Sequence, residues 1–149
     1  MKRITLLLVL LASSLLLSAQ EGLSIAGLFG HSTAFDHPED VTETHLSGKK
    51  LKVYRLTLFR SLKVENATAA DIDKMERAVK ADAARAVDKQ LLRRGNSIHY
   101  AFCKLPDRQG LHRYLIFRNK ARGKGRGNEL HLIYMEGTAS PEDLESIFK

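Results

Sequence analysis

The sequence changes character between two neighbouring segments, LKVYRLTLFRSLKV at residues 51–64 and TAADIDKMERAVKADAARAVDKQL at residues 68–91. In the first, apolar residues fall on alternate positions, as in a β-strand with one buried side; they are Tyr54, Leu56, Leu58, Leu62 and Val64. In the second, they recur at steps of three and four, as in an amphipathic helix; they are Ile72, Met75, Val79, Ala83, Ala86, Val87 and Leu91. This switch predicts a strand followed by a long helix.

The ends of the predicted helix carry their own signals. Thr68 and Asp71 have the spacing of a capping box, in which each side chain satisfies a free backbone N–H of the first turn. Gly95 is suited to end the helix in a left-handed conformation. The alanines between residues 69 and 86 allow a close approach to a sheet. We therefore expect one long, Ala-rich helix that ends near Gly95.

The flanking sequence supplies the other strands and two short helices. Four further segments have strand character: Val41–Leu46, Ser97–Leu105, Leu111–Lys120 and Glu129–Glu136. Short helices are indicated at Leu23–Phe29 and after Ser140-Pro141. Short connections favour antiparallel neighbours. The predicted fold is α+β: a single antiparallel sheet of about five strands, with the long helix on one face and short N- and C-terminal helices.

The first 19 residues have the three parts of a secretory signal peptide. Lys2 and Arg3 precede a mainly apolar run, Ile4–Leu17, and Ser18-Ala19 offers small residues for cleavage. We expect cleavage after Ala19, a single domain over residues 20–149, no membrane span in the mature chain, and a periplasmic or secreted product. The alternative is an uncleaved N-terminal anchor.

Composition narrows the function classes. The chain has 149 residues, 44% of them apolar, and a formal charge of +7 that falls to +5 without Lys2 and Arg3. One cysteine excludes an intramolecular disulfide framework. Export argues against nucleic acid as the partner of this basic protein. The expected partners are an acidic envelope glycan, a lipid phosphate or an acidic protein surface.

Three parts of the chain carry a resemblance to known proteins. The strand LKVYRLTLFRSLKV, the Ala-rich helix and the ending HLIYMEGTASPEDLESIF at residues 131–148 resemble small exported families of unknown function from Gram-negative bacteria. The resemblance implies a signal peptide and an α+β body with a C-terminal strand, glycine and helix. These families have no established active site, so the resemblance assigns no functional residue.

The last three strands define two faces if Leu105 lies opposite Leu111 and Lys120 opposite Glu129. The apolar face suits the Ala-rich helix; it holds Ala101, Cys103, Leu105, Leu111, Leu115, Phe117, Leu130, Leu132 and Tyr134. The other face also carries Ile98, Ile116, Ile133 and Met135, and its mixed aromatic and basic side chains suit a ligand: Tyr100, Phe102, His112, Tyr114, Arg118 and His131. The alternative, which we favour, is that a terminal helix covers this face.

The loop between the last two strands alternates glycine with cations. Four side chains are candidates for gripping an anion: Lys120, Arg122, Lys124 and Arg126. The competing and more common interpretation is a mobile, solvated hairpin loop. The acidic turn with Asp36, His37, Glu39 and Asp40 is similarly open to two interpretations, a site for a hard cation or, as we favour, a solvated turn.

Catalytic chemistry has weaker support. Cys103 is a nucleophile candidate with His99 or His112, but its apolar neighbours favour a buried packing role. The histidines lack zinc-site spacing, so no metal or cofactor is expected. The sequence therefore predicts an exported cell-envelope protein of unknown biochemical activity, a non-enzymatic binding or structural module. The alternative is a small hydrolase or metal-dependent enzyme that uses His112, His131 and Cys103.

Overall fold

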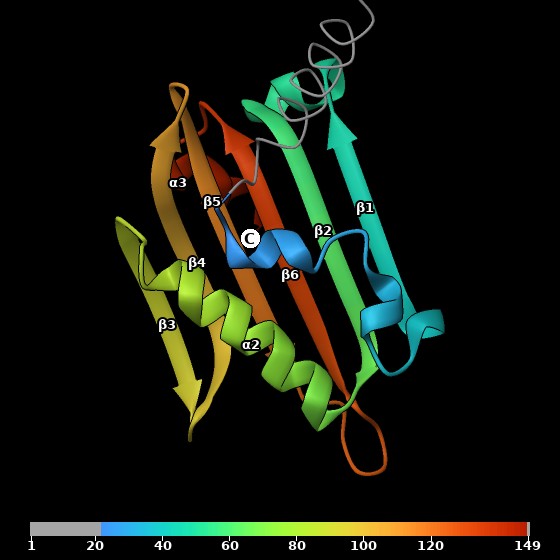
Figure 1. Ribbon diagram of the computed structural model, residues 1–149. Coiled ribbons are helices and arrows are strands. Elements are labelled where there is room, and N and C mark those ends of the chain that lie inside the picture. The colour runs from blue at the N-terminus through green and yellow to red at the C-terminus, as the bar shows by residue number, and fades with distance from the viewer. Residues whose placement is uncertain (1–21, 149) are drawn as a thin grey trace, which may run out of the picture.

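A computed structural model describes residues 22–148, and the predicted signal peptide lies outside these residues. The centre of the fold is a six-stranded sheet in the order β1-β2-β6-β5-β4-β3, in which all neighbours are antiparallel (Figure 1). The strands are β1 Val41–Ser47, β2 Leu56–Ala67, β3 Asp88–Arg94, β4 Ser97–Arg108, β5 Leu111–Lys120 and β6 Asn128–Gly137. The α+β class is confirmed, with six strands instead of about five.

The extra strand comes from the second half of the predicted long helix. Helix α2 spans only Ala69–Ala83, and after a turn the chain continues as β3. Leu91 still packs against the core under α2, but from a strand paired with Ala101 of β4. The Leu91 position satisfies both periodicities, and the strand also provides partners for the outer backbone groups of β4. This long-range pairing explains why the predicted helix end at Gly95 was wrong.

Both predicted helix starts are confirmed. The Thr68 hydroxyl accepts a hydrogen bond from the Asp71 N–H (3.2 Å), and the Asp71 carboxylate accepts one from the Thr68 N–H (3.1 Å). Ser140 and Asp143 make the same reciprocal pair at 3.2 and 2.9 Å before helix α3, Pro141–Phe148. Within residues 22–148, no helix combines the length and apolar character that crossing a membrane requires.

The segment predicted as one strand over residues 51–64 is divided. Its first part belongs to a 3-10 helix, η5 Lys49–Tyr54, which ends at Arg55 in a left-handed conformation (φ 57°). The Arg55 carbonyl accepts hydrogen bonds from the N–H groups of Thr138 and Ala139, both at 3.0 Å. The backbone of Arg55 also passes so close to Gly137 that a Cβ there would lie 2.3 Å from the Arg55 oxygen. This contact bends the chain, so β2 begins only at Leu56.

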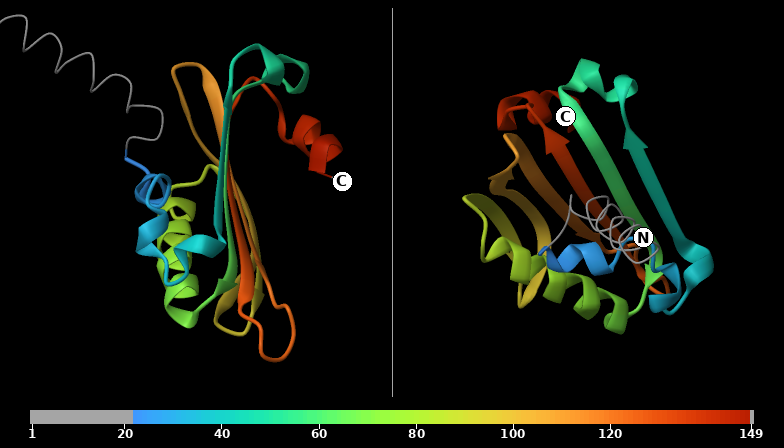
Figure 2. Two further views of the ribbon diagram at one scale, coloured as in Figure 1. Left: turned by 90° about the vertical axis from the view of Figure 1, so that its right-hand side faces the viewer. Right: turned by 45° about the horizontal axis from the view of Figure 1, so that its top comes forward.

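Helices cover the two faces of the sheet unequally. Helix α2 and the N-terminal 3-10 helices, η2 Ser24–Gly27, η3 Ser32–Ala34 and η4 Pro38–Asp40, lie against one face, which we call the α2 face (Figure 2). Helix α3 lies on the opposite side, the α3 face, near one end of the strands. The apolar residues predicted for a short N-terminal helix are all buried in the α2 core; they are Leu23, Ile25, Leu28 and Phe29.

The predicted faces are largely confirmed, although one pairing was wrong. Lys120 lies opposite Glu129 as expected, whereas Leu105 lies opposite Arg113 instead of Leu111. The two-residue shift keeps the parity, so the apolar face packs under α2 apart from Leu111, which is only half-buried. Ile98 is a second exception. Since His99 is the extra residue of a bulge, Ile98 turns into the α2 core, where its N–H donates to the Glu76 carboxylate (2.9 Å).

Candidate functional site

One half of the α3 face is closed by the C-terminal segment. Leu144 of α3, Ala139 and Leu51 of η5 are buried there together with Tyr114 and Met135 of the sheet. The Tyr114 hydroxyl donates to the Ala139 carbonyl at 2.6 Å, and burial raises the pKa of Tyr114 to about 12. Tyr114, predicted as part of a ligand face, is therefore a structural residue under this cover. Phe102 lies beside it, partly buried, with the ring centroids 5.9 Å apart.

The other half of the α3 face is open, and a row of side chains crosses it. Tyr100 of β4, Arg118 of β5, His131 of β6 and Lys63 of β2 are direct cross-strand neighbours. The Arg118 guanidinium lies over the Tyr100 ring, 5.7 Å from its centroid. A hollow of about 110 Å³ is lined by Tyr100, Ile116, Arg118, His131 and Ile133. The structure thus brings together three of the six predicted ligand-face residues, Tyr100, Arg118 and His131.

The charges in this row are unevenly compensated. The Lys63 ammonium lies 3.2 Å from Glu65 and 3.8 Å from Glu129, so it is shared between two carboxylates. Arg118 makes no ion pair within residues 22–148. Burial lowers the pKa of His131, and the positive charges of Lys63 and Arg118 lower it further, against the opposing effect of Glu129. The row therefore has an excess of positive potential that disfavours a proton on His131.

The residues of the predicted enzyme do not converge. Cys103 is buried on the α2 face, where burial raises the pKa of its thiol to about 11. His112 lies at the covered end of β5, opposite Gly137, and its Nδ1 lies 2.9 Å from the Asp107 carboxylate. His131 lies opposite Arg118, six residues further along β5, which corresponds to about 20 Å. A nucleophile and base, or a metal held by both histidines, is not assembled by this geometry.

The glycine-rich loop lies at the end of the sheet where β3 also ends (Figure 1). Gly123 and Gly125 adopt positive φ values of 98° and 77°, which favour glycine. The Arg122 guanidinium lies 3.9 Å from Glu129, whereas Lys124 and Arg126 are exposed. We call the six cations gathered here the basic end: Arg93, Arg94, Lys120, Arg122, Lys124 and Arg126.

The sequence interpretation missed part of these clusters. Arg93 and Arg94 fall within the helix predicted to end near Gly95 but are the last residues of β3, and Lys63 had no assigned role. Lys63 follows the apolar Leu62 in the alternating pattern of residues 51–64, so its side chain was expected on the face of the sheet opposite to that of Leu62. A buried polar pair was also missed: the Tyr134 hydroxyl donates to the Glu136 carboxylate (2.6 Å). Burial and this hydrogen bond raise the pKa of Tyr134, which fits a structural role.

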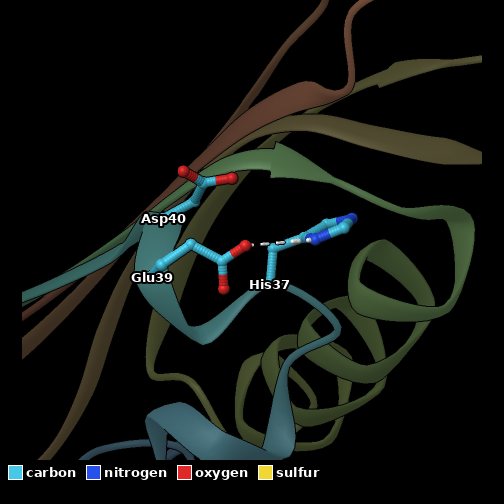
Figure 3. Close-up of side chains that lie close together, drawn as sticks. All are labelled: His37, Glu39 and Asp40. Atoms are coloured by element: carbon cyan, nitrogen blue, oxygen red, sulfur yellow. Dashed lines mark ion pairs between the residues drawn. The ribbon is translucent and has the colours of Figure 1, made fainter.

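The acidic turn brings three possible cation ligands together. Donor atoms of His37, Glu39 and Asp40 lie within 4.8 Å of one another. Figure 3 shows the three side chains on this turn. Asp36 turns away to helix α2, where its carboxylate accepts a hydrogen bond from the Thr68 hydroxyl. The exposed His37 and Glu39 and the half-buried Asp40 supply fewer ligands than the six to eight oxygens that calcium takes. The turn is therefore at most part of a ligand set.

Comparison with known families covers nearly the whole chain. Residues 12–148 match Family of unknown function (DUF6108). The chain belongs to this family. The DUF6108 match includes every described element, from η2 to α3, and therefore both faces of the sheet and the basic end. No curated protein and no solved structure matches the chain.

Proposed function

We propose that this DUF6108 protein is an exported, non-enzymatic binding module of the bacterial cell envelope. In this proposal the signal peptide is removed after Ala19, and the domain formed by residues 20–149 acts in the periplasm or outside the cell. Its ligands are phosphate or carboxylate groups at an envelope surface. The basic n-region and apolar run of residues 1–19 support export.

The observation that carries the proposal is the basic end. Its six cations come from three places in the sequence: the end of β3, the end of β5 and the β5–β6 loop. Glu129 lies among them but already contacts both Lys63 and Arg122. Such a concentration of exposed charge attracts anions at a distance and is screened by salt. The separation of Cys103, His112 and His131 favours binding over the enzymatic alternative.

The loop provides the test of this function. Replacing Arg122, Lys124 and Arg126 with Ser removes three charges from an exposed turn, so the free energy of unfolding should change little. Retention on anionic lipid vesicles or on an acidic polysaccharide should weaken and lose most of its salt dependence. Comparing the two materials separates lipid phosphate from glycan carboxylate as the source of the anion.

The matched control replaces Lys49, Lys50 and Lys52 with Ser. These exposed residues of η5 lie near the other end of the sheet, and the variant has the same net charge. It should keep wild-type retention. Identical salt curves for the two triple variants would reject the basic end as the binding region. Absence of retention for the wild-type protein would reject the function itself.

Export has its own test. N-terminal sequencing of protein purified from the envelope fraction of its native cells should give Gln20 as the first residue. A mature chain that still begins at Met1 would contradict signal cleavage.

A further inference from the structure

We propose that the open half of the α3 face is a separate site for a single-chain amphiphile, with its carboxylate head between Arg118 and His131 and its apolar chain across Tyr100 toward Leu92. This inference goes beyond the proposed function, because it concerns a discrete small-molecule site whose head-group residues, Arg118 and His131, are not among the cations of the basic end. It rests on the charge of the row, the shape of the surface and the exposed apolar side chains.

The charge of the row selects a monoanionic head. Around the hollow, Glu65 and Glu129 are balanced by Lys63 and Arg122, which lie within ion-pair distance of them. Among the residues that line the first hollow, Arg118 carries a positive charge and makes no ion pair within the described residues. A guanidinium matches a carboxylate through two parallel hydrogen bonds, and a neighbouring imidazole adds a third donor.

The surface around this charge is apolar. Ile116 and Ile133 form the floor of the hollow and remain only 5% and 6% exposed. A second hollow of about 460 Å³ adjoins the first and is lined by Leu92, His99, Tyr100, Arg118, Asn119 and Lys120. Tyr100 and Arg118 line both hollows, so they connect them across the strands.

The size and exposure of the second hollow favour a chain over a compact ligand. Its volume lies within the range of roughly 300–1,000 Å³ typical of ligand pockets. Leu92, at the side of the hollow away from His131, is 51% exposed, and its burial by an acyl chain is favourable. A carboxylate on Arg118 places the attached chain over the Tyr100 ring, which leads directly to Leu92.

Binding of a carboxylate at this site should be coupled to protonation of His131. The groups that face His131 are Lys63 on β2, Arg118 on β5 and Glu129 on β6. A bound carboxylate adds a negative charge beside the ring and so favours the imidazolium. Since the pKa of His131 is low in the free protein, ligand binding should raise it, and affinity should increase as the pH falls toward the range in which His131 titrates.

The test is calorimetric titration of the mature protein with dodecanoate below its micelle-forming concentration. Wild type should bind one dodecanoate, and Arg118→Gln should weaken the affinity roughly tenfold or more, because the charged hydrogen bonds are lost. The matched control Arg126→Gln makes the same change in the exposed loop and should stay within about twofold of wild type. Dodecyltrimethylammonium, with the same chain and a cationic head, should not bind.

A second readout follows His131 by NMR. Its pKa should rise in the presence of dodecanoate in wild type and stay unchanged in Arg118→Gln. The proposal is overturned if wild type shows no saturable binding, if Arg118→Gln binds as wild type does, or if the cationic amphiphile binds equally well. A double variant with Ser at 124 and 126, which keeps the Arg122–Glu129 contact, should still bind dodecanoate. Binding to anionic vesicles without dodecanoate binding would overturn this site and leave the proposed function standing.

Discussion

The two faces of the sheet use alternate residues of the same strands, yet one is covered far more extensively than the other. On the α2 face, α2 with its 15 residues and the N-terminal segment bury side chains from the four inner strands and pack against the partly buried Val41 of β1 and Leu91 of β3. On the α3 face, the covering helix has eight residues and a length of about 12 Å, and it lies near one end of the strands, whereas the 12 residues of β4 extend over about 40 Å. The position and length of α3 therefore leave the other end of this face open, and that end holds Tyr100, Arg118 and His131.

The largest expected effect comes from placing a charge in the covered face. Val79 of α2 is fully buried in the core between the helix and the sheet, and Val79→Asp should reduce the free energy of unfolding by about 4 kcal/mol, because the carboxylate has no partner there. Ala81→Asp adds the same charge at an exposed position of the same helix and should cost less than about 1 kcal/mol. Urea unfolding measures both; equal midpoints would mean that this face of α2 is not buried.

A smaller effect is expected from the contact that attaches the N-terminal segment to α2. The buried Asp82 carboxylate accepts hydrogen bonds from the N–H groups of Ser24 (2.7 Å) and Ile25 (2.9 Å). Asp82→Ala leaves the buried Ile25 N–H and the part-buried Ser24 N–H without this acceptor and should cost about 3 kcal/mol. Asp73→Ala removes an exposed carboxylate that pairs with Arg77 and should cost about 0.5 kcal/mol. Hydrogen exchange at residues 24–29 should accelerate only in Asp82→Ala; unchanged protection would contradict this role.

The cover of the α3 face should contribute less. Leu144→Ala should cost about 2 kcal/mol, since a short helix at the edge of the core relaxes into the space that is left. On the same face, Leu92→Ala should change stability by less than about 0.5 kcal/mol, because Leu92 is exposed. Thermal unfolding compares the two truncations. If Leu92→Ala proves as destabilising as Leu144→Ala, the open half is packed and the comparison of the two faces fails.

The smallest effect concerns the pH dependence of stability. Because folding lowers the pKa of His131, the unfolded state binds more protons, and wild-type stability should fall as the pH drops from about 8 through the range in which histidine titrates. His131→Gln should flatten this decline. Urea midpoints measured across this range provide the comparison, and parallel curves for the two proteins would show that His131 is not disfavoured as a cation in the folded state.

The sequence was sufficient to predict secondary structure and buried faces where local signals and the burial pattern agree. The capping pairs Thr68–Asp71 and Ser140–Asp143, the strands of the meander and the apolar side of the sheet follow from spacing alone. Leu91 is an example of a residue whose secondary structure does not follow from local spacing. Its position fits either a helix or a strand, and the pairing of β3 with β4, which places Leu91 opposite Ala101, decides between them. The row of Lys63, His131, Arg118 and Tyr100 depends on the register of four strands, and its exposure depends on where α3 lies, which are long-range properties.

The central claim is that the open half of the α3 face attracts anions while the α2 face is closed. Methyl NMR with two small paramagnetic probes of similar size, one with a carboxylate and one with a neutral amide, tests it directly. The carboxylate probe should broaden the methyl resonances of Ile116 and Ile133 more than the neutral probe does, and neither should broaden those of Leu130 and Leu132. Equal broadening by the two probes, or equal broadening of the four residues, would contradict the account.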